Sequence, residues 1–170
     1  MAGKKKIIVI DDEADLCFFI KGNLEEVGDF EVMTTTDPVN AQALCQSEKP
    51  DLILLDIVMP QIRGTDLVKT LRTSSETAKI PTVIISGLGE IVYFKKKGQW
   101  KWLPNRPVAL GRGEMTREKD SQRAAKLYGV DGYIAKPFTT EGLVEVIRDV
   151  LRRVQANESG EGTGLDIYEK

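Results

Sequence analysis

The chain alternates between short, wholly apolar runs and longer segments in which apolar residues recur every three or four positions. The runs are typical of buried strands, and the longer segments are typical of amphipathic helices. We therefore expect strands at about 6–10, 31–35, 51–55, 82–86 and 132–135. Helices are expected at about 13–27, 38–48, 64–73, 117–128 and 139–154. Five such strand–helix units predict a parallel sheet with helices on both faces and right-handed crossovers.

The first two helices carry boundary signals. Gly28 is expected to close the first helix, because glycine adopts the backbone conformation that ends helices. Asp37 is expected to cap the second helix, with Pro38 as its first helical residue. The pair Lys49 and Pro50 is expected to end that helix.

Polar residues follow four of the predicted strands. Asp11 and Asp12 follow the first strand, Asp56 the third, Ser86 the fourth and Lys136 the fifth. The carboxyl ends of parallel strands meet at one edge of a sheet, so these side chains should share one pocket. Clustered carboxylates with no histidine or thiolate nearby suit a hard cation such as Mg²⁺.

Composition narrows the choice of function. The chain has 170 residues, a net charge of −2 and no histidine, so a Ser-His-Asp triad, a histidine base and histidine-ligated zinc are excluded. Cys17 and Cys45 lie in predicted helices and are expected to be small core residues. The lysines before residue 7 precede too few apolar residues for a signal peptide, and no run reaches membrane-spanning length. We interpret the protein as cytoplasmic.

The residues at the strand ends, in this order, resemble the receiver domain of two-component response regulators. The resemblance covers about 6–153 apart from one insertion. It implies a flavodoxin-like (βα)5 fold, a doubly wound parallel five-stranded sheet with strand order 2-1-3-4-5. On this basis we expect a receiver domain at 1–154 and a flexible C-terminal tail at 155–170.

The resemblance assigns a phosphoacceptor and a metal site. Asp56 would be the nucleophile that forms an aspartyl phosphate. Mg²⁺ would be held by Asp11, Asp12, the Asp56 side chain and the backbone carbonyl of Val58. The metal would offset the repulsion between these carboxylates and the incoming phosphoryl group.

The resemblance also assigns a switch. Lys136 would pair with Asp56 and then with the phosphoryl oxygens, and its peptide bond to Pro137 is expected to be cis. Ser86 would hydrogen-bond a phosphoryl oxygen, and Tyr133 would move inward when Ser86 shifts. Taken singly, the acidic triplet at 11–13 suits a helix N-terminus, Lys136 a solvated loop and Tyr133 a core aromatic.

Two positions bear on the lifetime of the phosphorylated state. In this family the residues two after the phosphoacceptor and two after the serine often contact the hydrolytic water. Here they are Val58 and Leu88, and neither side chain can orient water by hydrogen bonding. We expect slow self-dephosphorylation.

An insertion at about 88–116 lengthens the connection after the fourth strand. Residues 91–95 and 99–103 predict two strands joined by a tight turn at 97–98. From 90 to 116 there are six basic and two acidic residues. In the expected register one face of this hairpin carries Tyr93, Lys95, Trp100 and Trp102.

Three interpretations of the hairpin stay open. Its aromatic residues could pack on their own domain, form a surface for a partner or a homodimer, or contact nucleic acid or anionic lipid. The small size of the basic patch makes nucleic acid the least favoured of these.

We predict a stand-alone receiver that takes a phosphoryl group from the phosphohistidine of a sensor histidine kinase or a histidine phosphotransfer protein. It would signal to a downstream protein through the face made by 117–128, 132–135 and 139–154, as a switch rather than a turnover enzyme. One rival is a haloacid-dehalogenase-type phosphatase, which needs a second Asp where this chain has Val58. The other is a receiver-like binding module that acts mainly through the insertion.

Overall fold

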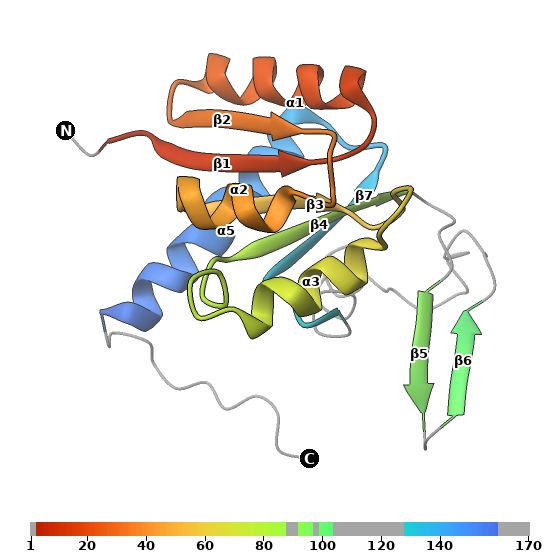
Figure 1. Cartoon of the computed structure of the whole chain (residues 1–170). Coiled ribbons are helices and arrows are strands. Elements are labelled where there is room, and N and C mark those ends of the chain that lie inside the picture. Colours follow the sequence, from red (N-terminus) through yellow and green to blue (C-terminus); the bar gives the residue numbers. More distant parts are fainter. Residues whose placement is uncertain (1–2, 88–91, 97–98, 104–127, 160–170) are drawn as a thin grey trace, which may run out of the picture.

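A computed structural model describes residues 3–87, 92–96, 99–103 and 128–159, and only the backbone of the two central segments. A parallel five-stranded sheet forms its centre, in the order β2-β1-β3-β4-β7 (Figure 1). Since β7 is the fifth strand of this sheet along the chain, the expected order 2-1-3-4-5 is confirmed. The strands are β1 (Lys5–Ile10), β2 (Phe30–Thr35), β3 (Leu52–Asp56), β4 (Thr82–Gly87) and β7 (Gly132–Lys136).

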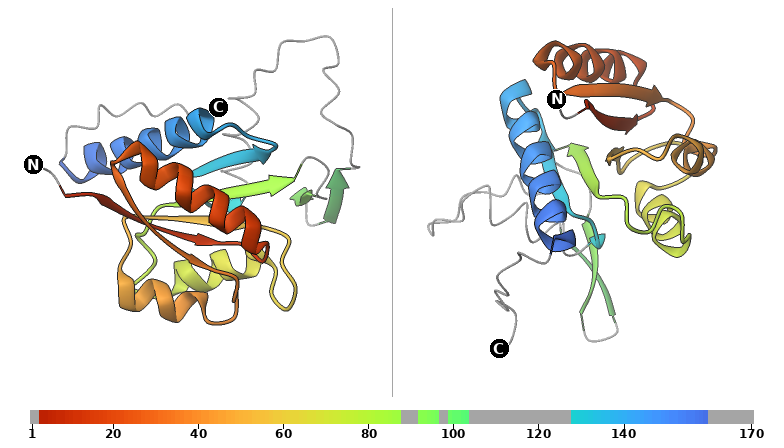
Figure 2. Two further views of the ribbon diagram at one scale, coloured as in Figure 1. Left: turned by 90° about the horizontal axis from the view of Figure 1, so that it is seen from above. Right: turned by 90° about the vertical axis from the view of Figure 1, so that its left-hand side faces the viewer.

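Helices cover both faces of this sheet. The right-hand view of Figure 2 shows strands between α5 on one side and α2 and α3 on the other. The helices are α1 (Ala14–Val27), α2 (Ala41–Glu48), α3 (Gly64–Thr73) and α5 (Thr140–Glu158). Alternate residues of β1 serve the two layers: Ile7 and Val9 pack with α1 and α5, while Ile8 and Ile10 pack with α2 and α3.

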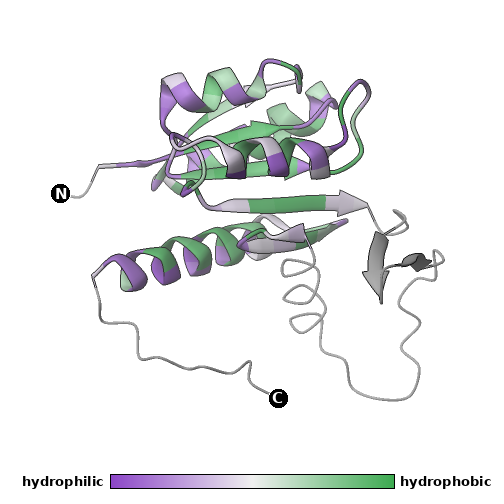
Figure 3. Cartoon of the chain, turned by 60° about the horizontal axis from the view of Figure 1, so that its bottom comes forward, coloured by the Kyte–Doolittle hydropathy of each residue, from purple (hydrophilic) through white to green (hydrophobic). Residues whose placement is uncertain are grey.

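Burial on both faces explains the apolar runs in the sequence. All four residues from Ile7 to Ile10 are buried, as are the five residues of β3. The helices instead alternate between hydrophobic and hydrophilic residues, as Figure 3 shows for α5. The apolar runs that predict strands most clearly therefore belong to β1 and β3, at the centre of the sheet.

Two helix ends differ from expectation. The second helix begins at Ala41 rather than at Pro38. The Asp37 carboxylate accepts hydrogen bonds from the backbone N–H groups of Val39 and Asn40, as an N-cap would, but residues 38–40 are not helical. The last helix continues to Glu158 rather than ending near 154, so residues 155–158 are helical and not part of a flexible tail. The helix expected at 117–128 lies outside the described residues except for its last position.

The inserted segment contains the expected pair of strands. β5 (Val92–Lys96) and β6 (Gln99–Leu103) are antiparallel, with Tyr93 opposite Trp102 and Lys95 opposite Trp100. The expected turn at 97–98 and the remaining residues of the insertion lie outside the described part of the chain. Among the described helices, none is both long and apolar enough to cross a membrane.

Candidate functional site

An acidic cluster lies at the carboxyl ends of two neighbouring central strands. Asp11 and Asp12 follow β1, and Asp56 is the last residue of β3. One carboxylate oxygen from each of the three lies within 4.8 Å of the others. Asp11 and Asp56 are only 1% and 3% exposed, whereas Asp12 faces solvent. The structure thus brings together the three side chains that the sequence predicted as metal ligands.

The donors of this cluster fit a hard cation. All three are carboxylates, the ligands that Mg²⁺ prefers. The nearest thiol belongs to Cys17, which donates a hydrogen bond to the backbone carbonyl of Asp11 at 3.4 Å. Burial, with the charge of Asp11, raises the pKa of Cys17 to about 11, so the thiol stays protonated and is no competing soft ligand.

Lys136 supplies the positive charge of the site. Its Nζ lies 3.2 Å from Asp11 Oδ2, 3.4 Å from Asp56 Oδ1 and 3.5 Å from Glu13 Oε1. Burial alone would lower the pKa of Lys136, but attraction to Asp11 and Asp56 outweighs it and the pKa is raised. The ammonium group of Lys136 therefore stays charged. The peptide bond from Lys136 to Pro137 is cis, as expected.

Asp11 is held in place from two sides. Its Oδ1 accepts the backbone N–H of Glu13 at 2.8 Å, and its Oδ2 faces Lys136. Burial raises the pKa of Asp11, although the Glu13 hydrogen bond and Lys136 both lower it. A second positive charge beside Asp11 would reverse the effect of burial, as a bound cation does.

Gly64 lies close against the end of β3, and the sequence did not reveal this. As the first residue of α3, it donates its N–H to the carbonyl of Ile57 at 2.8 Å. A Cβ atom there would lie 2.2 Å from the Asp56 carbonyl oxygen and 2.7 Å from Ile57 Cα. Only glycine lets the connection between β3 and α3 return this close to Asp56. The only hint in the sequence was a glycine at the predicted start of this helix, which can indicate a close approach of two backbone segments.

The two expected switch residues lie on the neighbouring strands. Ser86 is buried near the end of β4, paired in register with Ala135. Tyr133 lies on β7, packs against the core cluster shared with α2 and α3, and stacks on Tyr128 with ring centroids 6.4 Å apart and planes at 6°. This stacked pair was not predicted. The metal role of the Val58 carbonyl and the binding role of the hairpin residues stay predictions.

Comparisons with known proteins show the family of this chain. The family model described as "Response regulator receiver domain" matches residues 7–99. Among curated proteins, the DNA-binding dual master transcriptional regulator RpaA of Synechocystis is 29% identical over 148 residues, 87% of this chain and 49% of that protein. The phosphate regulon transcriptional regulatory protein PhoB of Rhizobium meliloti is 30% identical over 151 residues, 88% of this chain and 53% of that protein. The chain spans about half the length of these curated relatives.

Solved structures share the fold. Chemotaxis response regulator CheY4 of Vibrio cholerae aligns with a TM-score of 0.61 at 23% identity, covering 86% of this chain and 98% of that one. A CheY-like receiver domain protein from Methanospirillum hungatei aligns with a TM-score of 0.64 at 21% identity, covering 91% of this chain and 99% of that one.

Proposed function

Because the chain belongs to the family of response regulator receiver domains, we propose that Asp56 is its phosphoacceptor in two-component signalling. An Asp56 carboxylate oxygen attacks the phosphorus of a phosphohistidine on a partner protein. The new O–P bond forms as the P–N bond breaks, and the histidine of the donor leaves with its electron pair. The donor is a sensor histidine kinase or a histidine phosphotransfer protein.

The observation that carries this proposal is the ammonium group of Lys136 between Asp11 and Asp56. Lys136 orients the nucleophile and is already charged where phosphoryl oxygens would arrive. Asp11, Asp12, Asp56 and the Val58 carbonyl would hold Mg²⁺, which supplies charge neutralisation during transfer.

We assign the response of the switch to β4, which pairs with β3, and to β7, which pairs with β4. The Ser86 hydroxyl would donate a hydrogen bond to a phosphoryl oxygen on Asp56, since β4 pairs directly with β3. Movement of Ser86 would then change the space open to Tyr133, whose strand pairs with β4. The receiver domain, which ends with α5, would present this change to a downstream protein.

Phe18 marks a surface for the phosphodonor. α1 begins at Ala14, directly after the acidic cluster, and Phe18 lies one turn further with 80% of its side chain exposed. An exposed aromatic residue on the helix that directly follows the acidic cluster suits the docking of a partner protein. A histidine kinase or phosphotransfer protein as donor implies a cytoplasmic location for this chain. Separately, the hairpin of β5 and β6 is a candidate surface for a homodimer.

The rival functions have less support. Receiver domains are signalling switches, and the acid/base position of a haloacid-dehalogenase-type phosphatase holds Val58, whose side chain is apolar and exposed. A binding module that acts mainly through the insertion would not need the buried acidic cluster with its lysine.

Intact mass after incubation with Mg²⁺ and acetyl phosphate tests the proposal. We expect one phosphoryl group to be added per chain. None should be added when the metal is chelated, and none should be added to Asp56→Asn. Asp66→Asn is the matched control, because Asp66 is an exposed carboxylate on α3. Phosphorylation of Asp56→Asn, or turnover of the donor without an adduct, would contradict the assignment.

A further inference from the structure

The side chain of Glu13 turns to the acidic cluster, although its position is the N-cap of α1. A cap residue usually uses a side-chain oxygen to accept a backbone N–H from the first helical turn. The Glu13 side chain accepts no such hydrogen bond, and its backbone carbonyl accepts the N–H of Cys17 at 3.0 Å. Its Oε1 instead lies 3.5 Å from Nζ of Lys136. The Glu13 carboxylate therefore serves the site rather than the helix.

Glu13 differs in exposure from the two other carboxylates beside Lys136. The side chains of Asp11 and Asp56 are 2% and 4% exposed, whereas that of Glu13 is 67% exposed. Asp11 and Asp56 also accept hydrogen bonds from Lys136, and the contact with Glu13 is the longest of the three. An exposed carboxylate is readily solvated once its partner moves away, but a buried one is not. The Glu13 contact is therefore the one that Lys136 gives up most easily.

Glu13 also differs from its neighbours in its relation to the metal site. Among the described residues, the three carboxylates close enough together to share one cation are those of Asp11, Asp12 and Asp56. Asp11 and Asp56 therefore face both the cation site and Lys136. Glu13 faces Lys136 without belonging to that group.

The donors of the ammonium group set a limit on its partners. An ammonium group has three N–H donors, and three carboxylates lie within 3.5 Å of Lys136 Nζ. A phosphoryl oxygen that pairs with Lys136 must take the place of one of them. Glu13 is the partner that can leave, because its contact is the longest and its carboxylate is already exposed to water.

We propose that Glu13 is a positioning residue, which holds Lys136 in the unphosphorylated protein and releases it to the phosphoryl group. This inference rests on the proposed role of Asp56 as phosphoacceptor. Glu13 competes with the phosphoryl oxygens for the same ammonium group, so it favours the unphosphorylated state. Since exposed ion pairs are weak, the competition should change the affinity for a phosphoryl group about two- to five-fold.

Binding of beryllium trifluoride, a mimic of the phosphoryl group, tests this in the full chain. The amide signal of Ser86 is followed during titration at saturating Mg²⁺. Glu13→Gln removes the charge at constant length and should tighten binding about two- to five-fold. Glu13→Asp keeps the charge but withdraws it from Lys136 by one methylene group, and it should also tighten binding. Both variants keep the backbone N–H that Asp11 accepts, and loss of a merely structural residue would not tighten binding.

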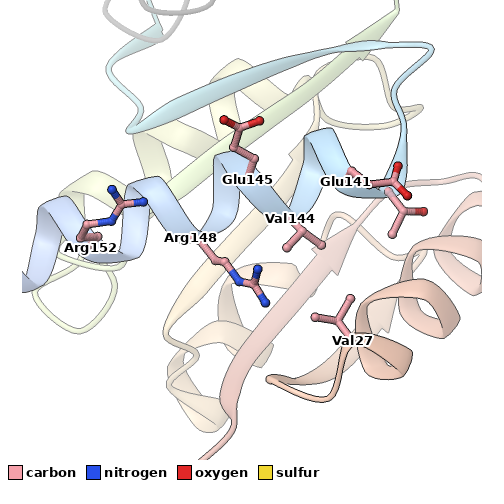
Figure 4. Close-up of a pocket in the computed structure, with 7 residues that line it drawn as sticks. Val27, Glu141, Val144, Glu145, Arg148 and Arg152 are labelled. Carbon is pink, nitrogen blue, oxygen red and sulfur yellow. The ribbon is translucent and has the colours of Figure 1, made fainter.

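Glu145→Gln is the matched control for the change in net charge. Glu145 is exposed on α5 and lines the groove beside Val27 (Figure 4), the last residue of α1 and roughly 20 Å along that helix from Glu13. Its affinity for beryllium trifluoride should equal that of the wild type.

Three results would overturn the role of Glu13. They are an unchanged affinity in Glu13→Gln, an equal gain in Glu145→Gln, and a wild-type affinity in Glu13→Asp, which would show that charge near the site suffices. A wild-type chain that binds no beryllium trifluoride would instead contradict the phosphoacceptor role of Asp56, and the Glu13 proposal with it.

Discussion

Substitution of Gly64 by alanine probes how closely the connection after β3 returns to Asp56. The added methyl group would lie 2.2 Å from the Asp56 carbonyl oxygen, where ordinary van der Waals contact begins at 3.4 Å. The obstacle is backbone, so it cannot rotate away as a flexible side chain would. Overpacking of this kind costs about 1–3 kcal/mol of unfolding free energy.

Gly22→Ala is the matched control. Gly22 is also helical, but a Cβ atom there meets nothing within 4 Å. Alanine should therefore stabilise the protein by roughly 0.5–1 kcal/mol through helix propensity alone. The same chemical change is thus expected to have opposite signs at two helical glycines of one protein.

Thermal unfolding followed by circular dichroism measures both effects. At about 2–4 °C per kcal/mol for a chain of this size, Gly64→Ala should lower Tm by roughly 2 to 12 °C. Phosphorylation by acetyl phosphate should also slow, by up to about 100-fold if the acceptor moves by about an ångström. A Gly64→Ala protein as stable as the Gly22→Ala protein would refute the argument from close approach.

Four further outcomes are expected. Lys136→Met should lower the free energy of unfolding at pH 7 by about 2 kcal/mol, which is less than the cost of breaking a fully buried pair. Because burial raises the folded-state pKa of Asp11, this loss of stability should shrink as pH falls and Asp11 is protonated. Urea unfolding at several pH values measures the loss, and a loss that grew as pH fell would contradict the reasoning. Phe18→Ala should slow transfer from a protein phosphodonor but not from acetyl phosphate, and equal slowing with both donors would argue against docking on α1. Cys17 and Cys45 should resist alkylation at pH 8 until the protein is unfolded, since with a pKa of about 11 only a minute fraction of either thiol is ionised, and rapid alkylation of the native protein would count against this. Val58→Asn should speed loss of phosphate from Asp56 by placing a polar side chain near the hydrolytic water, and an unchanged rate in a phosphate-release assay would remove Val58 as a cause of slow turnover.

The central strands and the acidic cluster could be predicted from sequence because both follow from short-range order. Burial on two faces leaves an unbroken apolar run in β1 and β3, and a parallel sheet brings the residues after those runs to one edge. Asp11, Asp12, Asp56 and Lys136 therefore converge as expected.

Features that depend on contacts distant in sequence could not be predicted. The closeness of Gly64 to Asp56 depends on how the connection folds back, and the Tyr128–Tyr133 stack depends on where two separate segments meet. The start of α2 was misplaced for a local reason. Asp37 makes the hydrogen bonds of a helix cap, to Val39 and Asn40, although the helix starts only at Ala41.

The sheet order gives the reach of Lys136 a wider meaning. β4 lies between β7 and β3, so the Lys136 and Asp56 side chains together bridge two strand spacings, roughly 10 Å, to bring Nζ within 3.4 Å of Oδ1. This single side chain tethers an outer strand to the middle of the sheet. A negative charge added at Asp56 would attract Lys136 directly. Its effect would therefore reach the outer strand β7 without a movement of the β4 backbone.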